Sequence, residues 1–421
     1  MIRWITAQVG TSAWGDDVNS DTSPLDVRDL VDGSGNALQD VRAKIDEGVR
    51  VLASGQKVVV LCDYGISRSN AIAAGVIALS RGSTFDDALA LVLAQTGEES
   101  IKLQMAATVR RALEEAPPRS SGAGGLLVTG GNGFLGTRLV ASLGSGREVV
   151  APTHAQVDLL RSPVPLDRLV RESEVDTLVH LAYPRVLTTN GAIGEATTAM
   201  KNVLDVCVEN GLHLFLMSSW EVFSGYRGPH FVVADEALEL QPGGTYGYGK
   251  ALCESLVEHL AKATGLRNCI IRSGPVFGTG SDRPRFIQTF TKKAVLQEPI
   301  IVHSYRNGLP HLDLLPVDAL VDGLVAAIEA RLTGKVHLGF ENPISTTDIA
   351  RRIVEVLDSN SPIVTRQVDA DAPKIVMASS RARSELGWTR TSNTFERVDE
   401  LAMQIAASVR TQPGVREPGD S

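Results

Sequence analysis

A cysteine and an arginine six positions apart form the first stretch of the chain whose residue types could do chemistry. Cys62 follows the apolar run 58–61, and Arg68 precedes a segment, 69–81, that is predicted to be helical. In a loop from a strand to a helix, the backbone N–H groups turn inward and the helix N-terminus adds partial positive charge. A guanidinium there can bind two oxygens. The pattern predicts a site for a phosphate dianion, with Cys62 as a thiolate nucleophile and Ser69 as a hydrogen-bond donor to the sulfur.

A tyrosine and a lysine four residues apart form a second such group. Tyr246 and Lys250 lead into a predicted helix that continues to residue 263, and this spacing puts both side chains on one helical face. An ammonium in that position favours the ionised phenol and can hold ribose hydroxyls. Upstream, a predicted strand, 214–217, ends in Ser218 and Ser219. A serine at the carboxyl end of a strand can bind a reacting oxygen, so the pattern predicts acid/base chemistry at a hydroxyl or carbonyl carbon.

A glycine-rich loop, 130–136, lies between a predicted buried strand, 126–129, and a predicted helix that ends at Leu143. Glycines permit a tight turn, let the backbone approach a pyrophosphate, and allow the helix to pack close to the strand. The loop therefore predicts a dinucleotide site. Its assigned cofactor-binding residues are Gly130, Gly133, Phe134, Leu135 and Gly136.

The end of the next predicted strand, 147–151, bears on the choice of cofactor. No acidic residue follows it to bind the 2′-hydroxyl of NAD; Thr153 and His154 stand there instead, and Arg138 lies on the preceding helix. These residues favour NADP slightly over NAD. Asp158, beside Leu159, either accepts a hydrogen bond from the adenine amino group or caps a helix.

Length and composition bound the remaining interpretations. A chain of 421 residues with 43% hydrophobic and 21% charged residues is expected to form two or three globular α/β domains. The small, polar segment 117–124 predicts a linker between a first domain, 1–116, and a second, 125–408. Helices are expected over 84–95 and 100–115, and a disordered tail over 409–421.

Several classes of function are disfavoured. The net charge of −8 argues against a nucleic-acid binder, and no apolar run approaches the length of a membrane span. The N-terminus has no signal-peptide pattern, and the cysteines at 62, 207, 253 and 269 have no metal-ligand spacing. We expect a cytoplasmic enzyme without a bound metal that acts on a small phosphorylated molecule and that can dimerise through its second domain.

The stretch 62–69, with its flanking strand and helix, resembles the active-site loop of the dual-specificity branch of cysteine-dependent phosphatases. The histidine that usually precedes the cysteine is Leu61 here. The resemblance implies an α/β phosphatase domain and an aspartate, on an upstream loop, that protonates the leaving oxygen. Asp32, which opens a Gly-Ser-Gly loop, fits best; Asp29 is the second choice, and Asp26 also stands near that distance.

Residues 125–408 resemble the extended branch of the short-chain dehydrogenase/reductase superfamily, which includes nucleotide-sugar epimerases and dehydratases. The matching motifs lie at 129–136, 180–182, 218–223, 246–250, 271–278 and 386–388. The resemblance implies a Rossmann-type doubly wound parallel sheet with a small substrate-binding subdomain. It assigns the catalytic serine to Ser219, the acid/base to Tyr246 and its partner to Lys250. Further cofactor contacts are implied at Leu181, Ala182, Pro275 and Val276.

Leu312 stands where many nucleotide-sugar relatives carry an arginine, so one diphosphate contact is missing. The sequence favours a bifunctional enzyme that combines phosphomonoester hydrolysis with NAD(P)-dependent oxidoreduction or epimerisation of a sugar- or nucleoside-type molecule. Two alternatives stay open. A dinucleotide-sensing domain could regulate a protein phosphatase, although Ser219, Tyr246 and Lys250 argue against a mere sensor. Alternatively, the N-terminal half only binds phosphate.

Overall fold

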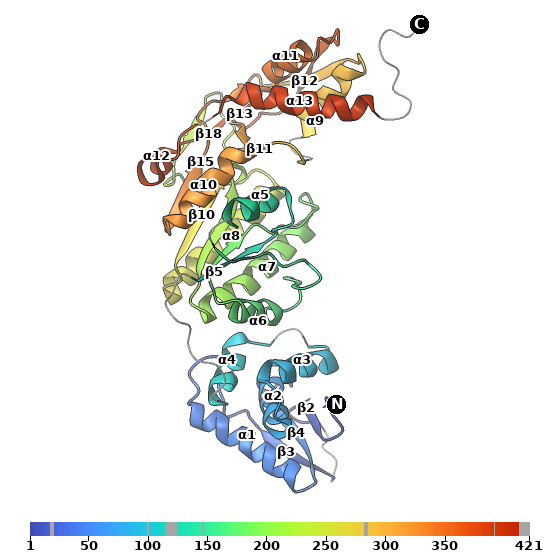
Figure 1. Cartoon of the computed structure of the whole chain (residues 1–421), viewed down its shortest axis with the longest axis vertical. Coiled ribbons are helices and arrows are strands. Elements are labelled where there is room, and N and C mark those ends of the chain that lie inside the picture. The colour runs from blue at the N-terminus through green and yellow to red at the C-terminus, as the bar shows by residue number, and fades with distance from the viewer. Residues whose placement is uncertain are drawn as a thin grey trace. The chain divides into compact units, whose positions relative to one another are not determined.

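The computed structural model of the chain describes residues 1–16, 21–98, 101–113, 124–144, 147–281, 285–390 and 392–411 (Figure 1). It divides into two compact units. The first comprises residues 1–123, 154–174 and 202–211, and the second comprises residues 124–153, 175–201 and 212–421. Most of the expected linker, residues 117–123, and residues 412–421 of the expected tail lie outside the described residues.

The first unit contains a four-stranded sheet in the order β1-β2-β4-β3. The short strand β1 (Arg3–Trp4) runs antiparallel to β2 (Val9–Ala13), whereas β4 (Lys57–Cys62) runs parallel to both β2 and β3 (Thr22–Asp26). Because β4 is central, its apolar run is fully buried. The helices are α1 (Leu38–Ala53), α2 (Arg68–Arg81), α3 (Phe85–Thr96) and α4 (Leu103–Ala112). The expected helix over 100–115 is thus shorter in the described residues.

Helix α6 (Val164–Glu172) also belongs to the first unit, where it takes part in a cluster of paired charges. Arg110 on α4 lies 2.9 Å from a carboxylate oxygen of Asp86 and 3.3 Å from one of Asp167. Arg171 on α6 contacts the same two carboxylates at 2.7 and 3.1 Å. Each carboxylate therefore faces two guanidiniums, which offsets the cost of burying its charge and ties α3, α4 and α6 together.

The second unit is built on a six-stranded parallel sheet, which confirms the predicted α/β fold with a Rossmann-type sheet. The strand order is β15-β10-β8-β7-β5-β6. The strands are β5 (Gly125–Thr129), β6 (Val149–Val150), β7 (Val175–His180), β8 (His213–Ser219), β10 (Asn268–Ser273) and β15 (Gly334–Leu338). The chain passes from β5 to β6 on one side and then to β7 on the other, and ligands bind at such a reversal point, at the carboxyl ends of the strands. The strand expected over 147–151 pairs only as the short edge strand β6.

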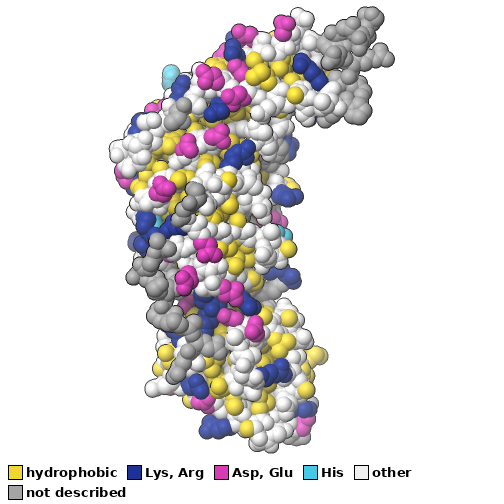
Figure 2. All heavy atoms as spheres, viewed as in Figure 1, with side chains coloured by type: hydrophobic (Ala, Val, Ile, Leu, Met, Phe, Trp, Pro, Cys, Tyr) yellow, Lys and Arg dark blue, Asp and Glu magenta, His cyan; other side chains and the backbone are white. Residues whose placement is uncertain are grey.

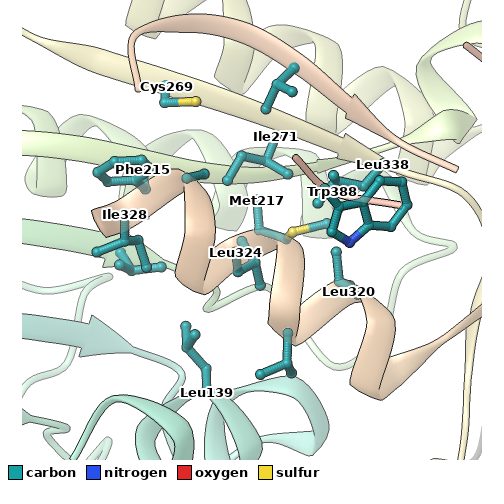
Figure 3. Packing of buried hydrophobic residues seen from close by; sticks show 14 of the residues in the cluster. Leu139, Phe215, Met217, Cys269, Ile271, Leu320, Leu324, Ile328, Leu338 and Trp388 are labelled. Atoms are coloured by element: carbon teal, nitrogen blue, oxygen red, sulfur yellow. The ribbon is translucent and has the colours of Figure 1, made fainter. Parts of the chain in front are cut away.

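One face of this sheet is covered by α5 (Phe134–Leu143) and α10 (Val317–Glu329). Leu139 of α5 and Leu320 and Leu324 of α10 pack with Phe215 and Met217 of β8 in a continuous apolar core (Figure 3). Side chains alternate between the two faces of a strand, so Ser218 points away from α10. The other helices near this sheet are α7 (Asn190–Glu209), α8 (Thr245–Thr264) and α12 (Ser380–Leu386).

The rest of the second unit contains two-stranded pairings and a separate apolar core. The pairs are β9 (Val232–Ala234) with β18 (Ile375–Met377), β11 (Val276–Phe277) with β14 (Leu315–Pro316), β12 (Ile300–Tyr305) with β17 (Ile363–Val368), and β13 (His311–Leu312) with β16 (Ile344–Ser345). The core joins α9 (Arg285–Val295), α11 (Thr346–Val356) and α13 (Thr394–Arg410). Helix α13 runs two residues beyond position 408.

Charged side chains of both signs are interspersed on the face drawn in Figure 2. None of the helices in the described part of the chain combines the length and the apolar character needed to cross a membrane. Among the same residues, no group of three or more His, Cys, Asp or Glu side chains is arranged to hold a metal ion.

Candidate functional site

The glycine-rich loop between β5 and α5 lies against the carboxyl end of β7. Gly130 has φ +73°, and a Cβ atom there would lie 2.7 Å from the backbone nitrogen of Ala182. The N–H group of Leu181 donates to the carbonyl of Thr129 at 3.1 Å, which fixes the two strand ends together. At Gly136 a side chain would collide with the carbonyl of Gly130. The loop can therefore close tightly only with glycine at these positions.

The N-terminus of α5 is free to bind an anion. Gly133 is its N-cap residue, and no side chain in the described chain caps this helix. The N–H groups of Phe134 and Leu135 therefore remain available in the first turn, where the helix dipole favours negative charge. A Cβ atom at Gly133 would meet only the Gly130 carbonyl, at 3.2 Å, so its other side is open. This arrangement fits the diphosphate of a dinucleotide.

The guanidinium of Arg138 is hydrogen-bonded to two backbone carbonyls, so it does not support a preference for the 2′-phosphate of NADP. Its Nη1 donates to the carbonyl of Phe134 at 2.9 Å, and its Nη2 donates to the carbonyl of Thr279 at 2.6 Å. The lean toward NADP consequently rests on Thr153 and His154. The imidazole Nε2 of His154 lies 3.8 Å from a carboxylate oxygen of Asp158.

The interpretation of Asp158 as a helix N-cap is wrong. The chain makes a turn there, in which the N–H group of Arg161 donates to the carbonyl of Asp158 at 3.2 Å, and α6 begins only at residue 164. The carboxylate of Asp158 accepts from the N–H group of Leu160 at 3.0 Å, and the Leu159 carbonyl accepts from Asn202 at 2.8 Å. Both residues belong to the first unit, and their contact with the adenine stays a prediction.

Ser219, Tyr246 and Lys250 come from two elements that meet at the carboxyl end of β8. Ser219 is the last residue of β8 and precedes the short helix η1 (Trp220–Phe223). Tyr246 and Lys250 occupy the first turns of α8, and the Lys250 ammonium donates to the carbonyl of Met217 at 2.7 Å. A side chain at Gly247 would collide with the carbonyl of Glu221, so α8 begins directly on η1. The structure thus brings the three predicted catalytic residues to one edge of the sheet.

Burial governs the charge of Lys250. The side chain is 4% exposed, and this desolvation lowers its pKa to about 8. The ammonium lies 5.8 Å from the ring centroid of Tyr246. Below about pH 8 the lysine is charged, and a cation at this distance favours the phenolate form of the tyrosine.

Tyr183 is a member of the site that the sequence pattern did not predict. Its ring meets the Tyr246 ring edge-on, with centroids 5.0 Å apart and planes at 84°. The Lys250 ammonium lies 4.4 Å from the Tyr183 centroid, and the Tyr183 hydroxyl donates to the Tyr246 carbonyl at 3.5 Å. A Cβ atom at Gly249 would collide with that hydroxyl. The available signal was its place, three residues after His180 at the carboxyl end of β7.

The neighbouring predicted contacts lie at the same ends of the strands. His180 is buried, its Nδ1 is 2.7 Å from the Thr129 hydroxyl, and burial lowers its pKa to about 3, so it is neutral. Pro275 and Val276 follow β10, where the Pro275 carbonyl accepts from Leu315 at 2.9 Å. Their contact with the nicotinamide stays a prediction. Leu312 packs against the core of α9, α11 and α13.

In the first unit, the predicted loop lies between β4 and α2, and its role as an anion site stays a prediction. Cys62 ends β4 and Arg68 begins α2. Gly65 has φ +68°, and a Cβ atom there would lie 2.7 Å from the Ser12 backbone. Within the described chain, none of the N–H groups from residue 63 to residue 68 donates a hydrogen bond to the protein. The Cys62 thiol donates to the Ser69 hydroxyl at 3.3 Å. The predicted role of Ser69 as a donor to the sulfur stays a prediction.

Arg68 ties this loop to the segment that carries the candidate acids. Its Nη1 donates to the carbonyls of Arg28 and Leu30 at 3.0 and 2.9 Å. Its Nη2 is paired with the carboxylate of Asp63, within the loop itself. The guanidinium is therefore held beside the loop, but an acidic side chain lies against one of its edges.

The three candidate acids have different partners in the structure. The Asp26 carboxylate accepts three hydrogen bonds from the Arg28 guanidinium, and this pairing lowers its pKa, so Asp26 is poorly suited to donate a proton. Asp29 lies 3.0 Å from the ammonium of Lys44. Asp32 lies 3.2 Å from the ammonium of Lys102, and its other oxygen is buried without a hydrogen bond among the described residues. Asp29 and Asp32 remain the candidates.

Comparison with known proteins identifies the larger part of the chain. The sequence model of the NAD dependent epimerase/dehydratase family matches residues 126–339. The UDP-glucose 4-epimerase of Azospirillum brasilense is 24% identical over 340 residues, which are 70% of this chain and 96% of that protein. UDP-glucuronic acid decarboxylase 1 of Arabidopsis thaliana is 26% identical over 296 residues, which are 62% of this chain and 65% of that protein.

Solved structures share the fold. The Thermus thermophilus UDP-glucose 4-epimerase in complex with NAD has a TM-score of 0.58 at 18% identity, over 66% of this chain and 98% of that one. The Pseudomonas aeruginosa protein RMD in complex with NADPH has a TM-score of 0.58 at 17% identity, over 68% and 100%. The family model and the glycine-rich loop at the N-terminus of α5 together indicate a cofactor of the NAD(P) type. The chain belongs to the NAD dependent epimerase/dehydratase family.

Proposed function

We propose that the second unit oxidises a carbinol carbon of a nucleotide-linked sugar, as the first step of an epimerisation, a dehydration or a decarboxylation. The observation that carries this proposal is the hydrogen bond from Lys250 on α8 to the Met217 carbonyl on β8, two residues before Ser219. Tyr246 lies one turn earlier on the same helix. The relatives named as UDP-glucose 4-epimerase and UDP-glucuronic acid decarboxylase support the nucleotide-sugar class.

In the proposed reaction, the Tyr246 phenolate takes the proton of the substrate hydroxyl while the hydride leaves the same carbon. NAD(P), when bound, supplies the acceptor for that hydride. Ser219 donates a hydrogen bond to the reacting oxygen, and Lys250 stabilises the phenolate through its charge. The residues that hold the cofactor are those of the loop 130–136, with Leu181, Ala182, Pro275 and Val276 beside it.

At the position of Leu312, this chain lacks a cation that could bind the diphosphate of a nucleotide sugar. Leu312 is apolar and packs against the core of α9, α11 and α13, so it cannot pair with a diphosphate. We therefore expect weaker binding of a UDP-sugar than an arginine at that position would give.

The full-length protein, incubated with NAD or NADP and with UDP-glucose, UDP-galactose or UDP-glucuronic acid in separate reactions, tests the proposal. Conversion, followed by NMR of the sugar protons, should occur with at least one substrate and disappear in Tyr246→Phe. Absence of conversion in a protein shown to bind the cofactor would contradict the nucleotide-sugar class.

We also propose that the first unit hydrolyses small phosphomonoesters at Cys62. This rests on the unpaired N–H groups of the loop 63–68, the Cys62–Ser69 contact and the placement of Arg68 beside the loop. The Cys62 thiolate would attack phosphorus, and the ester oxygen would leave with a proton from Asp32 or Asp29. Water would then hydrolyse the cysteinyl phosphate, with Ser69 bound to the departing sulfur. A thiolate nucleophile needs a reducing compartment, for which we propose the cytoplasm.

Hydrolysis of an aryl phosphate by the full-length protein, with Cys62→Ser as the control, tests this second function. Binding of inorganic phosphate without hydrolysis would favour the alternative that the first unit only binds phosphate. The sensor alternative would be favoured by two results together: NAD(P) changes the rate of aryl phosphate hydrolysis, and the second unit shows no redox turnover that Tyr246→Phe could reduce.

A further inference from the structure

The second unit contains a fully buried ion pair. Arg272 on β10 is 0% exposed, and Glu254 on α8 is 1% exposed. The Arg272 Nη2 lies 2.6 Å from a Glu254 oxygen, and its Nε lies 3.1 Å from both oxygens. Desolvation makes such a pair a weak source of stability, and apolar residues of similar volume often do as well. Stability alone therefore does not explain why the second unit contains this buried ion pair.

The pair belongs to a hydrogen-bonded network. The Ser218 hydroxyl donates to Glu254, and the Arg272 Nη1 lies 3.2 Å from the Nε2 of His337. Burial lowers the pKa of His337 to about 3, so this imidazole is neutral. Because arginine only donates, His337 accepts through Nε2 and donates through Nδ1 to the Ala234 carbonyl at 3.0 Å.

The network touches both elements that carry the candidate catalytic groups. Glu254 lies one helical turn after Lys250 on α8, on the same face. Ser218 directly precedes Ser219 on β8. The Arg272 guanidinium also lies 5.2 Å from the ring centroid of Phe223, in the η1 helix that follows Ser219. Arg272 is thus in contact with α8 through Glu254 and with the segment after β8 through Phe223.

We propose that Glu254 and Arg272 are positioning residues, which fix the depth and rotation of α8 against β8 so that Tyr246 and Lys250 meet Ser219. The inference rests on the proposed function of those three residues. Neither Glu254 nor Arg272 touches the reacting atoms; both act through the helix and strand that they join.

Electrostatics supports the same role. Burial lowers the pKa of Lys250, and the Glu254 carboxylate acts in the opposite direction and favours the ammonium. The other groups that face this ammonium are Tyr183, Tyr246, Cys253 and the neutral His180. Glu254 is the carboxylate among these groups, so its loss removes a charge that keeps Lys250 protonated.

The experiment measures the titration of Tyr246 in the full-length protein. Phenolate absorbance near neutral to alkaline pH is recorded for the wild type and for Glu254→Met combined with Arg272→Met. In each background, Tyr246→Phe is subtracted to isolate this tyrosine. Without the positioned cation, the measured pKa of Tyr246 should rise by roughly one unit or more. Because both charges are removed together, the unfolding midpoint should fall only by the cost of leaving the Ser218 hydroxyl and the His337 Nε2 without partners, and the variant should still fold. An unchanged Tyr246 titration in this folded variant would overturn the inference.

Two further variants complete the test: one is a control at a different ion pair, and the other replaces the double variant if that protein does not fold. Arg352 and Asp399 form a similar two-point pair between α11 and α13, at 2.9 and 2.6 Å, and Asp399→Asn should leave the Tyr246 titration unchanged. If the double variant does not fold, Arg272→Lys, which keeps a cation beside Glu254, is titrated instead. It should shift Tyr246 in the same direction by a smaller amount, and no shift would overturn the inference. Failure of the proposed function has a separate sign, namely a Tyr246→Phe protein with undiminished turnover.

Discussion

The ammonium of Lys250 lies over the face of Tyr183, 4.4 Å from the ring centroid, and the same ring meets Tyr246 edge-on. Tyr183 comes from the end of β7, whereas Lys250 and Tyr246 come from α8. A tyrosine outside the predicted catalytic group thus contacts both members of the acid/base pair. Burial raises the pKa of Tyr183, so its hydroxyl stays protonated and acts as a donor to the Tyr246 carbonyl.

Replacing Tyr183 should separate the ring from its hydroxyl. Tyr183→Phe keeps the aromatic face over Lys250 and should retain most of the turnover. Tyr183→Leu removes the cation–π contact, worth about 0.5–2 kcal/mol, so kcat should fall by roughly 2- to 30-fold. Steady-state kinetics of the two variants decides this. Equal losses in both would show that the hydroxyl, rather than the ring, matters.

Tyr246→Phe removes the ionisable phenol without changing the shape of the ring. Turnover of the second unit should therefore fall by roughly two to four orders of magnitude, the usual value of acid/base catalysis. The rate of aryl phosphate hydrolysis, measured on the same preparation, should not change. A Tyr246→Phe protein with wild-type turnover would remove Tyr246 from the reaction.

The activity of the second unit should fall as the pH rises through about 8. Burial lowers the pKa of Lys250 to about 8, so the ammonium that favours the Tyr246 phenolate is lost above that value. In Glu254→Gln, kcat should begin to fall at a lower pH, because the Glu254 carboxylate favours the charged form of Lys250. A profile of kcat against pH measures both. If kcat falls at the same pH in Glu254→Gln as in the wild type, the Glu254 carboxylate does not control the pKa of Lys250.

Gly133→Val should eliminate dinucleotide binding. A Cβ atom at this position meets only the Gly130 carbonyl, at 3.2 Å, so the loop can adjust to it while the methyl groups of valine fill the space of the diphosphate. Calorimetric titration with NAD and NADP measures the loss, and wild-type affinities test the slight lean to NADP. Tighter binding of NAD by more than roughly tenfold, about 1.4 kcal/mol, would show that the inference from Thr153 and His154 is wrong.

In the first unit, Cys62→Ser should abolish phosphate-ester hydrolysis and leave cofactor binding intact, since an alcohol is not ionised near neutral pH. Asp32→Asn should slow esters with poor leaving groups more than esters with good ones, because only the former need a proton. A series of aryl phosphates measures the difference. A larger effect of Asp29→Asn would transfer the acid to that residue, and wild-type hydrolysis by Cys62→Ser would remove the nucleophile.

Features encoded within a short stretch of chain could be predicted from the sequence. The strand, glycine loop and helix over 125–143 and the spacing of Tyr246 and Lys250 on α8 depend on local backbone preferences and helical periodicity. The positions of Cys62 at the end of β4 and of Arg68 at the start of α2 follow for the same reason. The position of Ser219 at the carboxyl end of its strand could likewise be predicted, because a short apolar run defines that strand.

Contacts between distant parts of the chain were decided only by the tertiary structure. The place of Tyr183 over Lys250, the pairing of Arg272 with Glu254 and the engagement of Arg138 with Thr279 each join residues from separate elements. Alternating strand positions and helical faces tell which side a residue occupies, but only the packing of the elements determines which side chain it meets there.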